Sequence, residues 1–272
     1  MPSLPFFQVD AFAAKAFEGN QACVMALDAF LPDETLLAIA AENNVAETAY
    51  IVAAGEGVWK LRWFTPAVEV PLCGHATLAS AHVLFSQLGF TGETIAFDTV
   101  KSGRLHVKRL ADGRLEMDFP SAPIRPVPVT DEIAAALGAR PLEAWCGMFY
   151  AARFGTPEDV RALKPDQRAL KSLGAEGDGW DRGNFGCFAL GGDGADATSR
   201  FFAPGSGIDE DPATGSWHTM LSRILGQNFA MPAARCYQAY PGRGAWVGVS
   251  LEGDRCKLTG NAVTVIEGRF TL

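Results

Sequence analysis

Alternating apolar and polar side chains predict several β-strands. The alternation is clear over residues 58–64 (VWKLRWF) and 94–99 (TIAFDT), and side chains that repeat with a period of two line the two faces of a strand. Residues 104–110 and 114–119 flank Ala111-Asp112-Gly113. An Asp-Gly turn between two such segments predicts a β-hairpin.

A second pair of strands is predicted near the C-terminus. Residues 245–251 and 256–266 flank a turn at Gly253-Asp254. Short strands joined by tight turns are typical of antiparallel pairing, whereas a doubly wound sheet needs a regular alternation of strands and helices. The pattern therefore favours an α+β protein over a doubly wound α/β protein.

Three segments are predicted to be helices. Residues 32–43 begin with proline and acidic residues and end at two asparagines, as helices commonly do. Residues 76–88 (ATLASAHVLFSQL) and 216–225 (SWHTMLSRIL) end before Gly89 and Gly226, and glycine often stands just after a helix. The helix over residues 76–88 is apolar or small on nearly every side, so we expect it to be buried.

Residues 120–128 (PSAPIRPVP) contain four prolines. Proline lacks a backbone donor and interrupts helices, so this segment cannot form a helix interior or a central strand. We interpret it as the link between two α+β domains, residues 1–119 and residues 120–259. The C-terminal strand, at about residues 260–272, can return to the first domain.

The two halves of the chain contain similar segments. Residues 64–85 (FTPAVEVPLCGHATLASAHVLF) align with residues 202–225 (FAPGSGIDEDPATGSWHTMLSRIL). Each segment begins with Phe-x-Pro, crosses an acidic loop, reaches a glycine followed by a polar residue and enters a helix. The alignment makes three equivalent pairs: Gly74 with Gly215, His75 with Ser216, and Cys73 with Thr214. Such a repeat predicts two similar domains that bring equivalent helix N-termini together.

The composition limits the classes of partner and location. The 272 residues carry a formal charge of −8 and give a pI of about 5.1, which disfavours nucleic acid or an anionic membrane as the partner. The N-terminus lacks the basic flank of a signal peptide, and no apolar run reaches about 18 residues. The six cysteines lie far apart and form no C-x-x-C pair. We therefore expect a cytoplasmic protein with reduced thiols.

The four histidines give no sign of a metal site. No two of them stand four residues apart, and the sequence has no H-x-x-x-H or C-x-x-C motif. We therefore expect no metal. The sequence also lacks G-x-x-x-x-G-K-[ST] and G-x-G-x-x-G, so it does not indicate a phosphate-binding loop.

The helix starts near Gly74 and Gly215 offer a place for an anion. The first turn of a helix has unpaired N–H groups and the positive end of the helix dipole, which attract carboxylates and stabilise oxyanions. A glycine there lets a ligand approach the backbone closely. Two such ends facing across a cleft would hold a small anionic molecule from both sides.

Four ordered motifs resemble the PhzF family of phenazine-biosynthesis isomerase-like proteins. They are residues 9–25 (VDAFAAKAFEGNQACVM), 43–52 (NNVAETAYIV), 64–84 (FTPAVEVPLCGHATLASAHVL) and 209–221 (DEDPATGSWHTML). The similarity extends over essentially the whole chain. It implies the diaminopimelate epimerase-like superfamily, which also contains proline racemase. The implied fold is α+β, with two pseudo-symmetric domains that each wrap a sheet around a central helix.

The resemblance places the catalytic residues of the family on Glu47, His75 and Asp211. From the sequence alone, Glu47 is either a strand-end glutamate or a partly buried one, and burial makes a carboxylate more basic. His75 is either a capping or packing residue or a neutral hydrogen-bond donor, because the helix dipole is expected to lower the pKa of its ring. Asp211 precedes Pro212 in an acidic loop, where side chains are usually solvated.

The substrate-binding positions implied by the resemblance are Gly74, Gly215, Ser216 and Cys73. Ser216 also suits a helix N-cap. Racemases of the superfamily use two cysteines as opposed bases, whereas here Thr214 stands opposite Cys73, and a hydroxyl is too weak a base to replace a thiolate. Cys73 is therefore either an inert buried thiol or an auxiliary group. Trp217 replaces an expected small residue and either narrows the pocket or packs in the core.

These residues imply a cofactor-independent isomerase that acts on a small carboxylate metabolite in a cleft between the domains. Glu47 would move a proton between two carbons on one face, while His75 and Asp211 would orient polar groups of the substrate. The resemblance alone implies a homodimer. Two alternatives stay open: an amino-acid racemase or epimerase, and a non-catalytic binding or interaction protein that retains the cleft.

Overall fold

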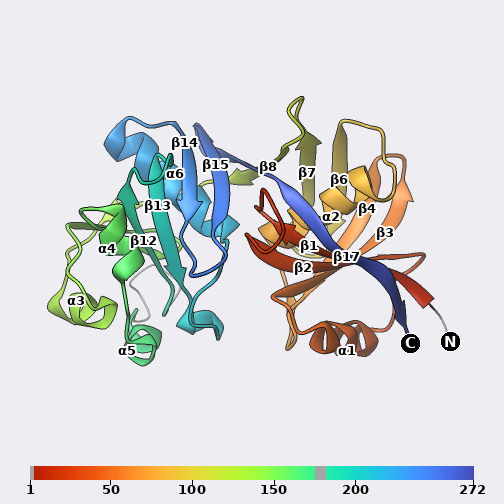
Figure 1. Cartoon of the computed structure of the whole chain (residues 1–272), viewed down its shortest axis with the longest axis horizontal. Coiled ribbons are helices and arrows are strands. Elements are labelled where there is room, and N and C mark those ends of the chain that lie inside the picture. Colours follow the sequence, from red (N-terminus) through yellow and green to blue (C-terminus); the bar gives the residue numbers. More distant parts are fainter. Residues whose placement is uncertain (1–2, 175–181) are drawn as a thin grey trace. The chain divides into compact units, whose positions relative to one another are not determined.

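The computed structural model describes residues 3–174 and 182–272. Their contacts divide them into two compact units, one made of the residues up to Asp118 together with Thr259–Leu272, and the other made of Phe119–Leu258. Figure 1 shows the helices and strands of both units. Among the described residues, no helix is both long enough and apolar enough to cross a membrane.

The first unit combines a mixed β-sheet with two helices. The helices are α1 (Asp33–Asn43) and α2 (Gly74–Ser86). The strands are β1 (Ser3–Ala11), β2 (Asn20–Leu27), β3 (Glu47–Gly55), β4 (Val58–Phe64), β5 (Glu69–Val70), β6 (Thr94–Thr99), β7 (Arg104–Arg109), β8 (Leu115–Pro120) and β17 (Ala262–Thr271). The pairing runs β17-β1-β2-β3-β4-β6-β7-β8, and the short β5 also pairs with β4.

The second unit has a sheet of the same kind with more helices. The helices are α3 (Asp131–Leu137), α4 (Pro157–Ala162), α5 (Gln167–Ser172), α6 (Gly215–Phe229) and the 3₁₀ turn η1 (Pro204–Ser206). The strands are β9 (Arg125–Pro126), β10 (Glu143–Cys146), β11 (Tyr150–Arg153), β12 (Phe185–Leu190), β13 (Ala197–Phe202), β14 (Ala233–Gln238), β15 (Ala245–Glu252) and β16 (Arg255–Gly260). They follow the order β9-β10-β11-β12-β13-β14-β15-β16.

The two units share one chain path. In the first unit, β2 and β3 are parallel with α1 between them, and β4 and β6 are parallel with α2 between them. In the second unit, α4 and α5 join the parallel pair β11 and β12, and α6 joins the parallel pair β13 and β14. The strand signals in the sequence favoured antiparallel pairing. They missed these four parallel pairs because a helical crossover leaves no turn sequence between the partners.

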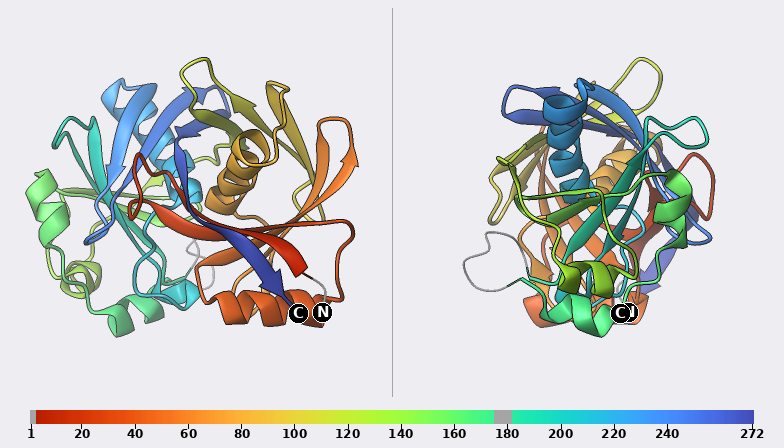
Figure 2. Two further views of the ribbon diagram at one scale, coloured as in Figure 1. Left: turned by 45° about the vertical axis from the view of Figure 1, so that its right-hand side comes forward. Right: turned by 90° about the vertical axis from the view of Figure 1, so that its left-hand side faces the viewer.

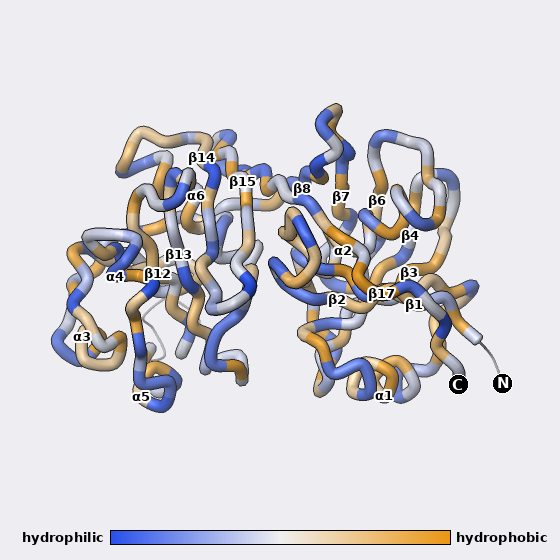
Figure 3. The backbone as a smooth tube through the Cα atoms, in the orientation of Figure 1, coloured by the Kyte–Doolittle hydropathy of each residue, from blue (hydrophilic) through white to orange (hydrophobic). Residues whose placement is uncertain are grey.

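A buried helix lies at the centre of each unit. In α2, all residues from His75 to Phe85 are buried except His82, and the helix packs against β1, β2, β3 and β17. Figure 2 shows α2, in gold, beside the red strands of the first unit, and Figure 3 shows the hydropathy along the chain. In the second unit, α6 packs against β14 and β15. These arrangements agree with the predicted α+β class, with one central helix in each unit.

The end of α6 differs from the sequence prediction. The helix continues through Gly226 to Phe229, and Ala230 takes the left-handed cap conformation with φ of 54°. A Cβ atom at Gly226 would lie 2.8 Å from Cδ2 of Leu251, so the glycine allows close packing against β15 and does not end the helix. The strand predicted over residues 256–266 is likewise divided at Asn261 into β16 and β17.

Candidate functional site

Glu47 and His75 form a close pair in the first unit. Glu47 is the first residue of β3 and His75 is the second residue of α2. Oε2 of Glu47 lies 3.0 Å from Nε2 of His75, and only 17% of the glutamate side chain and 7% of the histidine side chain are exposed. No hydrogen-bond donor among the described residues is aligned with this Oε2 atom. The pair is therefore a shielded ionic contact that leaves a buried carboxylate oxygen unsatisfied.

Cys73 and Asn20 complete the surroundings of the His75 ring. Sγ of Cys73 lies 3.6 Å from Nδ1 of His75, and Nδ2 of Asn20 lies 3.4 Å from the same nitrogen. Both side chains are buried. Asn20 is a site residue that the sequence reasoning did not single out, because an asparagine beside a turn glycine is ordinary.

The local structure explains why these residues meet. The strands β2 and β3 are parallel, and Ala22 pairs with Glu47, so the two strands begin at the same edge of the sheet. Cys73 is extended, with φ of −144° and ψ of 110°, directly before α2. Because α2 packs on β2 and β3, the turn into the helix at Gly74 brings the thiol and the imidazole to that edge.

The sequence predicts a lowered pKa for His75, and this prediction is wrong. Burial by itself lowers the pKa of the ring, but the neighbouring Cys73 and Glu47 raise it, and the net direction is upward. Cys73 and the Glu47 carboxylate 3.0 Å away together favour the imidazolium, and these two neighbours outweigh burial. Burial, and then the charge of Glu47, raise the pKa of the Cys73 thiol, so its neutral form is the stable one.

Asp211 belongs to a polar cluster in the second unit. Oγ1 of Thr214 donates a hydrogen bond of 2.5 Å to Oδ2 of Asp211, and Nε2 of Gln238 donates one of 2.6 Å to the backbone oxygen of Asp211. Oε1 of Gln238 accepts a hydrogen bond of 2.9 Å from the backbone N–H of Thr214. Gln238 is fully buried at the end of β14. One amide side chain therefore fixes both ends of the loop that carries Asp211, and no local sequence signal identified it.

The two central helices begin without a side-chain cap. Neither Cys73 before α2 nor Thr214 before α6 forms one, although threonine is a residue type that suits the position. The Thr214 hydroxyl donates its hydrogen bond to the Asp211 side chain instead. The shorter helices α3, α4 and α5 do have side-chain caps, from Thr130, Thr156 and Asp166. The first turn of α6, which contains Gly215 and Ser216, and the first turn of α2, which contains Gly74, thus both lack a side-chain cap.

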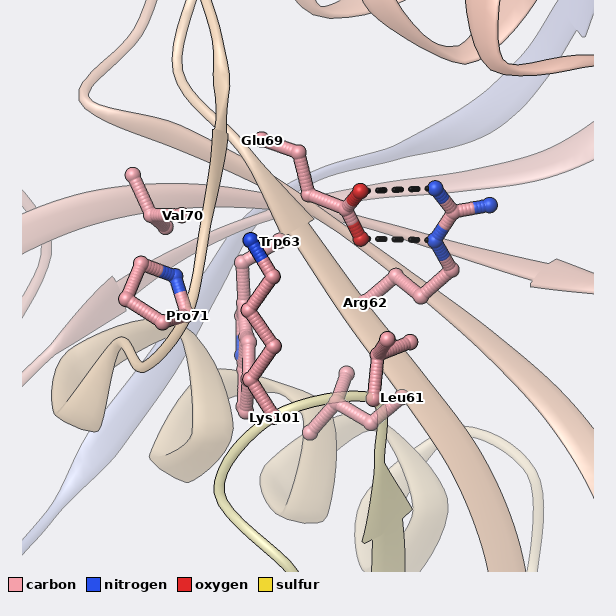
Figure 4. Close-up of a pocket in the computed structure, with 8 residues that line it drawn as sticks. Leu61, Arg62, Trp63, Glu69, Val70, Pro71 and Lys101 are labelled. Carbon is pink, nitrogen blue, oxygen red and sulfur yellow. Dashed lines mark hydrogen bonds and ion pairs between the residues drawn. The ribbon is translucent and has the colours of Figure 1, made fainter.

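Each unit has an arginine–glutamate fork ahead of its central helix. Nε and an Nη atom of Arg62 donate to the two carboxylate oxygens of Glu69 at 2.7 and 2.8 Å (Figure 4). Arg200 donates to Glu210 in the same way at 2.8 and 2.7 Å. The forks are equivalent, because each glutamate pairs with the phenylalanine that begins a repeated segment. They hold the loops that lead into α2 and α6.

The predicted site residues therefore fall into two groups. The structure brings Glu47, Cys73 and His75 together, with ligand atoms within 4.8 Å of one another, and Gly74 lies between the last two in sequence. Asp211, Gly215 and Ser216 lie in the second unit. None of the residues that line the pocket of Figure 4 belongs to either group.

Comparisons with known proteins agree with one another. A sequence profile of the family described as phenazine biosynthesis-like protein matches residues 9–268. An uncharacterized isomerase of Pseudomonas aeruginosa is 42% identical over 273 residues, which cover 99% of each chain. A crystal structure of a PhzF family phenazine biosynthesis protein from Enterococcus faecalis matches with a TM-score of 0.93 and 36% identity over 100% of both chains.

A more distant structure extends the likeness of the fold. A probable proline racemase from Agrobacterium radiobacter matches with a TM-score of 0.60 and 12% identity, and the match covers 99% of this chain and 93% of that one. At this identity the match concerns the fold alone. It places the architecture among the epimerase-like folds.

Proposed function

Because the chain belongs to the phenazine biosynthesis-like (PhzF) protein family, we propose that it is an isomerase that moves a proton within a small carboxylate substrate. The contact between Glu47 and His75 carries this proposal. A carboxylate oxygen without an aligned donor lies 3.0 Å from an imidazole at the start of a buried helix. A shielded carboxylate of this kind can accept a proton from carbon.

In the proposed reaction, Glu47 takes a proton from a C–H bond that a neighbouring unsaturated group makes acidic. The electron pair of that bond forms a new π bond to the adjacent carbon, and the original π electrons move onto the far carbon, where they form the new C–H bond. Glu47, now a carboxylic acid, returns the proton to a second carbon on the same face of the substrate. Atoms and electrons balance without a cofactor, and the product is an isomer of the substrate.

His75 is the proposed cationic partner of the base. Its raised pKa favours the imidazolium form, which stabilises the Glu47 carboxylate before the reaction. The same cation can donate a hydrogen bond to the negative charge that develops on the substrate. In this form Nδ1 donates to Sγ of Cys73, which holds the ring in this orientation.

Asp211 is proposed to bind a polar group of the substrate. A carboxylate accepts several hydrogen bonds, so Asp211 can accept one from a hydroxyl or amine as well as the one from Thr214. The backbone N–H groups of Gly215 and Ser216 would bind the substrate carboxylate, aided by the helix dipole. Gln238 supports both roles because it fixes the backbone of this loop.

A two-base racemase agrees less well with these side chains. Inversion at carbon needs one base on each face of the substrate. Cys73 contacts the same imidazole as Glu47, and its raised pKa keeps the thiol protonated. Thr214, the equivalent residue in the second unit, donates its hydroxyl hydrogen to Asp211. A single base is therefore the simpler mechanism.

Hydrogen exchange at carbon tests the proposal. The protein is incubated in heavy water with a panel of small unsaturated carboxylic acids and α-amino acids, and NMR spectroscopy follows the C–H signals and the position of each double bond. We expect double-bond migration in at least one unsaturated acid and none with Glu47→Gln. Glu56→Gln makes the same change at an exposed turn position after β3 and should retain the wild-type rate.

Three results would contradict the proposal. Migration at the wild-type rate in Glu47→Gln would exclude Glu47 as the base. Exchange of an α-hydrogen without movement of a double bond would identify an epimerase. Saturable binding of an acid without any reaction, unchanged by Glu47→Gln, would identify a non-catalytic binding protein.

A further inference from the structure

The cluster around His75 contains a set of donor atoms that a proton shift does not require. A carboxylate oxygen of Glu47, Sγ of Cys73 and a ring nitrogen of His75 all lie within 4.8 Å of one another. Oxygen, sulfur and nitrogen donors in this combination are typical ligands of zinc. We propose that these three residues bind Zn²⁺, with the fourth coordination position open to water or to a small carboxylate.

The separations of the donor atoms suit a tetrahedral ion. Oε2 of Glu47 lies 3.0 Å from Nε2 of His75, and Sγ of Cys73 lies 4.0 Å from the same nitrogen. Zinc bonds of about 2.0 Å to nitrogen and oxygen and about 2.3 Å to sulfur would place such donors roughly 3.3–3.6 Å apart. The carboxylate–imidazole separation is close to this range, whereas Sγ lies nearer Nδ1, at 3.6 Å, than Nε2, so the Cys73 side chain has to turn toward Nε2 to bind the same ion.

The hydrogen bonds around the cluster leave the required atoms available. Oε2 of Glu47 is buried without an aligned donor among the described residues, and in the metal-bound state the cation replaces its ion-pair contact with the His75 ring. Nδ2 of Asn20 lies 3.4 Å from Nδ1 of His75, on the side of the ring away from Nε2. Histidine ligands commonly donate their second N–H to an acceptor, which orients the ring toward the metal, and exchanging the amide nitrogen and oxygen of Asn20 would place such an acceptor beside Nδ1.

The charges of the donors select the kind of cation. A bound thiolate and carboxylate carry two negative charges, which offset Zn²⁺ and outweigh the positive end of the α2 dipole, roughly half an elementary charge. Magnesium and calcium prefer sites made of oxygen atoms, so the thiolate favours zinc or cobalt. Binding releases the thiol proton, and the proton of the imidazolium where it is present, to the solvent.

The metal site and the proposed proton shift use the same side chains and exclude each other. A zinc ion bound to Glu47 occupies the oxygen that would accept a proton, so zinc acts as an inhibitor in this proposal and has no role as a cofactor. The binding of zinc does not depend on the proposed reaction. No spacing motif in the sequence indicates this set, because β3 supplies one donor and the start of α2 supplies the others.

Cobalt provides a spectroscopic test, since Co²⁺ occupies zinc sites and absorbs light. The whole protein, reduced and free of metal, is titrated with Co²⁺. We expect one equivalent to produce a thiolate-to-cobalt charge-transfer band in the near ultraviolet and tetrahedral ligand-field bands in the visible, all removed by Zn²⁺. Cys73→Ala should abolish the charge-transfer band, whereas Cys23→Ala, which removes another buried thiol of the same unit, should retain it.

Competition with a chromophoric chelator measures the other two ligands. We expect Glu47→Gln and His75→Gln each to raise the Kd for zinc at least tenfold, with near-ultraviolet circular dichroism confirming the fold. X-ray absorption of the zinc-loaded wild-type protein should show one sulfur ligand, and it needs no variant. Absence of the charge-transfer band in the wild type, its survival in Cys73→Ala, or a zinc shell without sulfur would overturn the proposal. A negative result here leaves the exchange experiment with Glu47→Gln unaffected.

Discussion

The indole ring of Trp217 lies directly against the backbone of Gly186. A Cβ atom added at Gly186 would be 2.2 Å from Cζ3 of Trp217, far inside van der Waals contact. Trp217 is fully buried, and its ring centroid lies 6.3 Å from that of Phe188 and 6.2 Å from that of Phe201. Trp217 therefore packs in the core of the second unit, which decides between the two interpretations that the sequence left open.

This contact predicts an energetic coupling between the two positions. We expect Gly186→Ala to lower the free energy of unfolding by about 1–3 kcal/mol through overpacking, and Trp217→Ala to lower it by about 3–5 kcal/mol through loss of a large buried ring. The double variant should lose less than the sum, because the added methyl group enters the space that the ring vacates. Urea unfolding followed by circular dichroism measures all three, and strictly additive losses would contradict the contact.

The buried fork of Arg200 and Glu210 should contribute more to stability than an exposed fork of the same geometry. The side chains of Arg200 and Glu210 are 7% and 11% exposed, whereas those of Arg104 and Asp98 are 51% and 42% exposed. Both pairs form two hydrogen bonds of 2.7 to 2.9 Å. Arg200 also donates to the backbone oxygens of Val160, Arg161 and Leu163.

We therefore expect Glu210→Gln to lower the free energy of unfolding by about 3 kcal/mol, because it leaves a buried guanidinium without its counter-charge. Asp98→Asn should have a much smaller effect, since solvent screens an exposed pair. Denaturant unfolding at low and high salt compares the two variants. Equal losses, or a loss in Glu210→Gln that high salt removes, would show that the Arg200 fork is not shielded.

Features with a local signal could be predicted from the sequence. Alternation identified β4 and β6, and the turn at Asp112-Gly113 identified the β7–β8 hairpin. The repeat alignment located the starts of α2 and α6, because each follows the same order of Phe-x-Pro, acidic loop and glycine. The candidate site residues Glu47, Cys73 and His75 came from the family motifs, and the structure then supplied their distances.

Features that depend on distant contacts could not be predicted. The helices α3, α4 and α5 have seven, six and six residues, too few for a hydrophobic period to be visible. Asn20 and Gln238 reach their clusters through strand pairing, which no local pattern encodes. The pKa of His75 is raised by Cys73 and by the Glu47 carboxylate on another element, whereas the sequence indicated only that His75 begins a helix.

Two histidines, the buried His218 and the half-buried His82, should make the protein less stable in acid. Burial lowers the pKa of His82 to about 4, and it likewise lowers the pKa of His218 to about 4. Unfolded histidine has a pKa of about 6.5, so between these values the unfolded chain binds protons that the folded chain does not. These two residues therefore leave stability unaffected above about pH 6.5 and lower it as the pH decreases toward 4, by up to about 3 kcal/mol for each histidine.

His82→Gln isolates one of these contributions. Glutamine can keep a hydrogen bond with Oγ1 of Thr264, which now lies 3.0 Å from Nε2 of His82, but it does not titrate. The unfolding free energy should fall less between pH 6.5 and 4 in this variant than in the wild type, because the contribution of His82, up to about 3 kcal/mol, is absent. Urea unfolding at several pH values measures the difference. His106→Gln, at an exposed position on β7, is the matched control. An unchanged slope in His82→Gln would show that this ring is not held neutral by burial.

The thiol of Cys73 should react slowly, and Glu47 should be one cause. Burial and the charge of Glu47 raise the pKa of this thiol, and thiolate is the form that reacts with alkylating reagents. We expect Glu47→Gln to speed the reaction of Cys73 with iodoacetamide at pH 8. The rate should rise by up to about tenfold for each unit by which the substitution lowers the pKa of the Cys73 thiol, while Glu56→Gln should leave the rate unchanged. Mass spectrometry of the peptide that contains Cys73 gives the rate, with the buried Cys187 as internal reference. Equal rates in the wild type and Glu47→Gln would mean that the carboxylate does not act on the thiol, and the arrangement of the cluster would then be wrong.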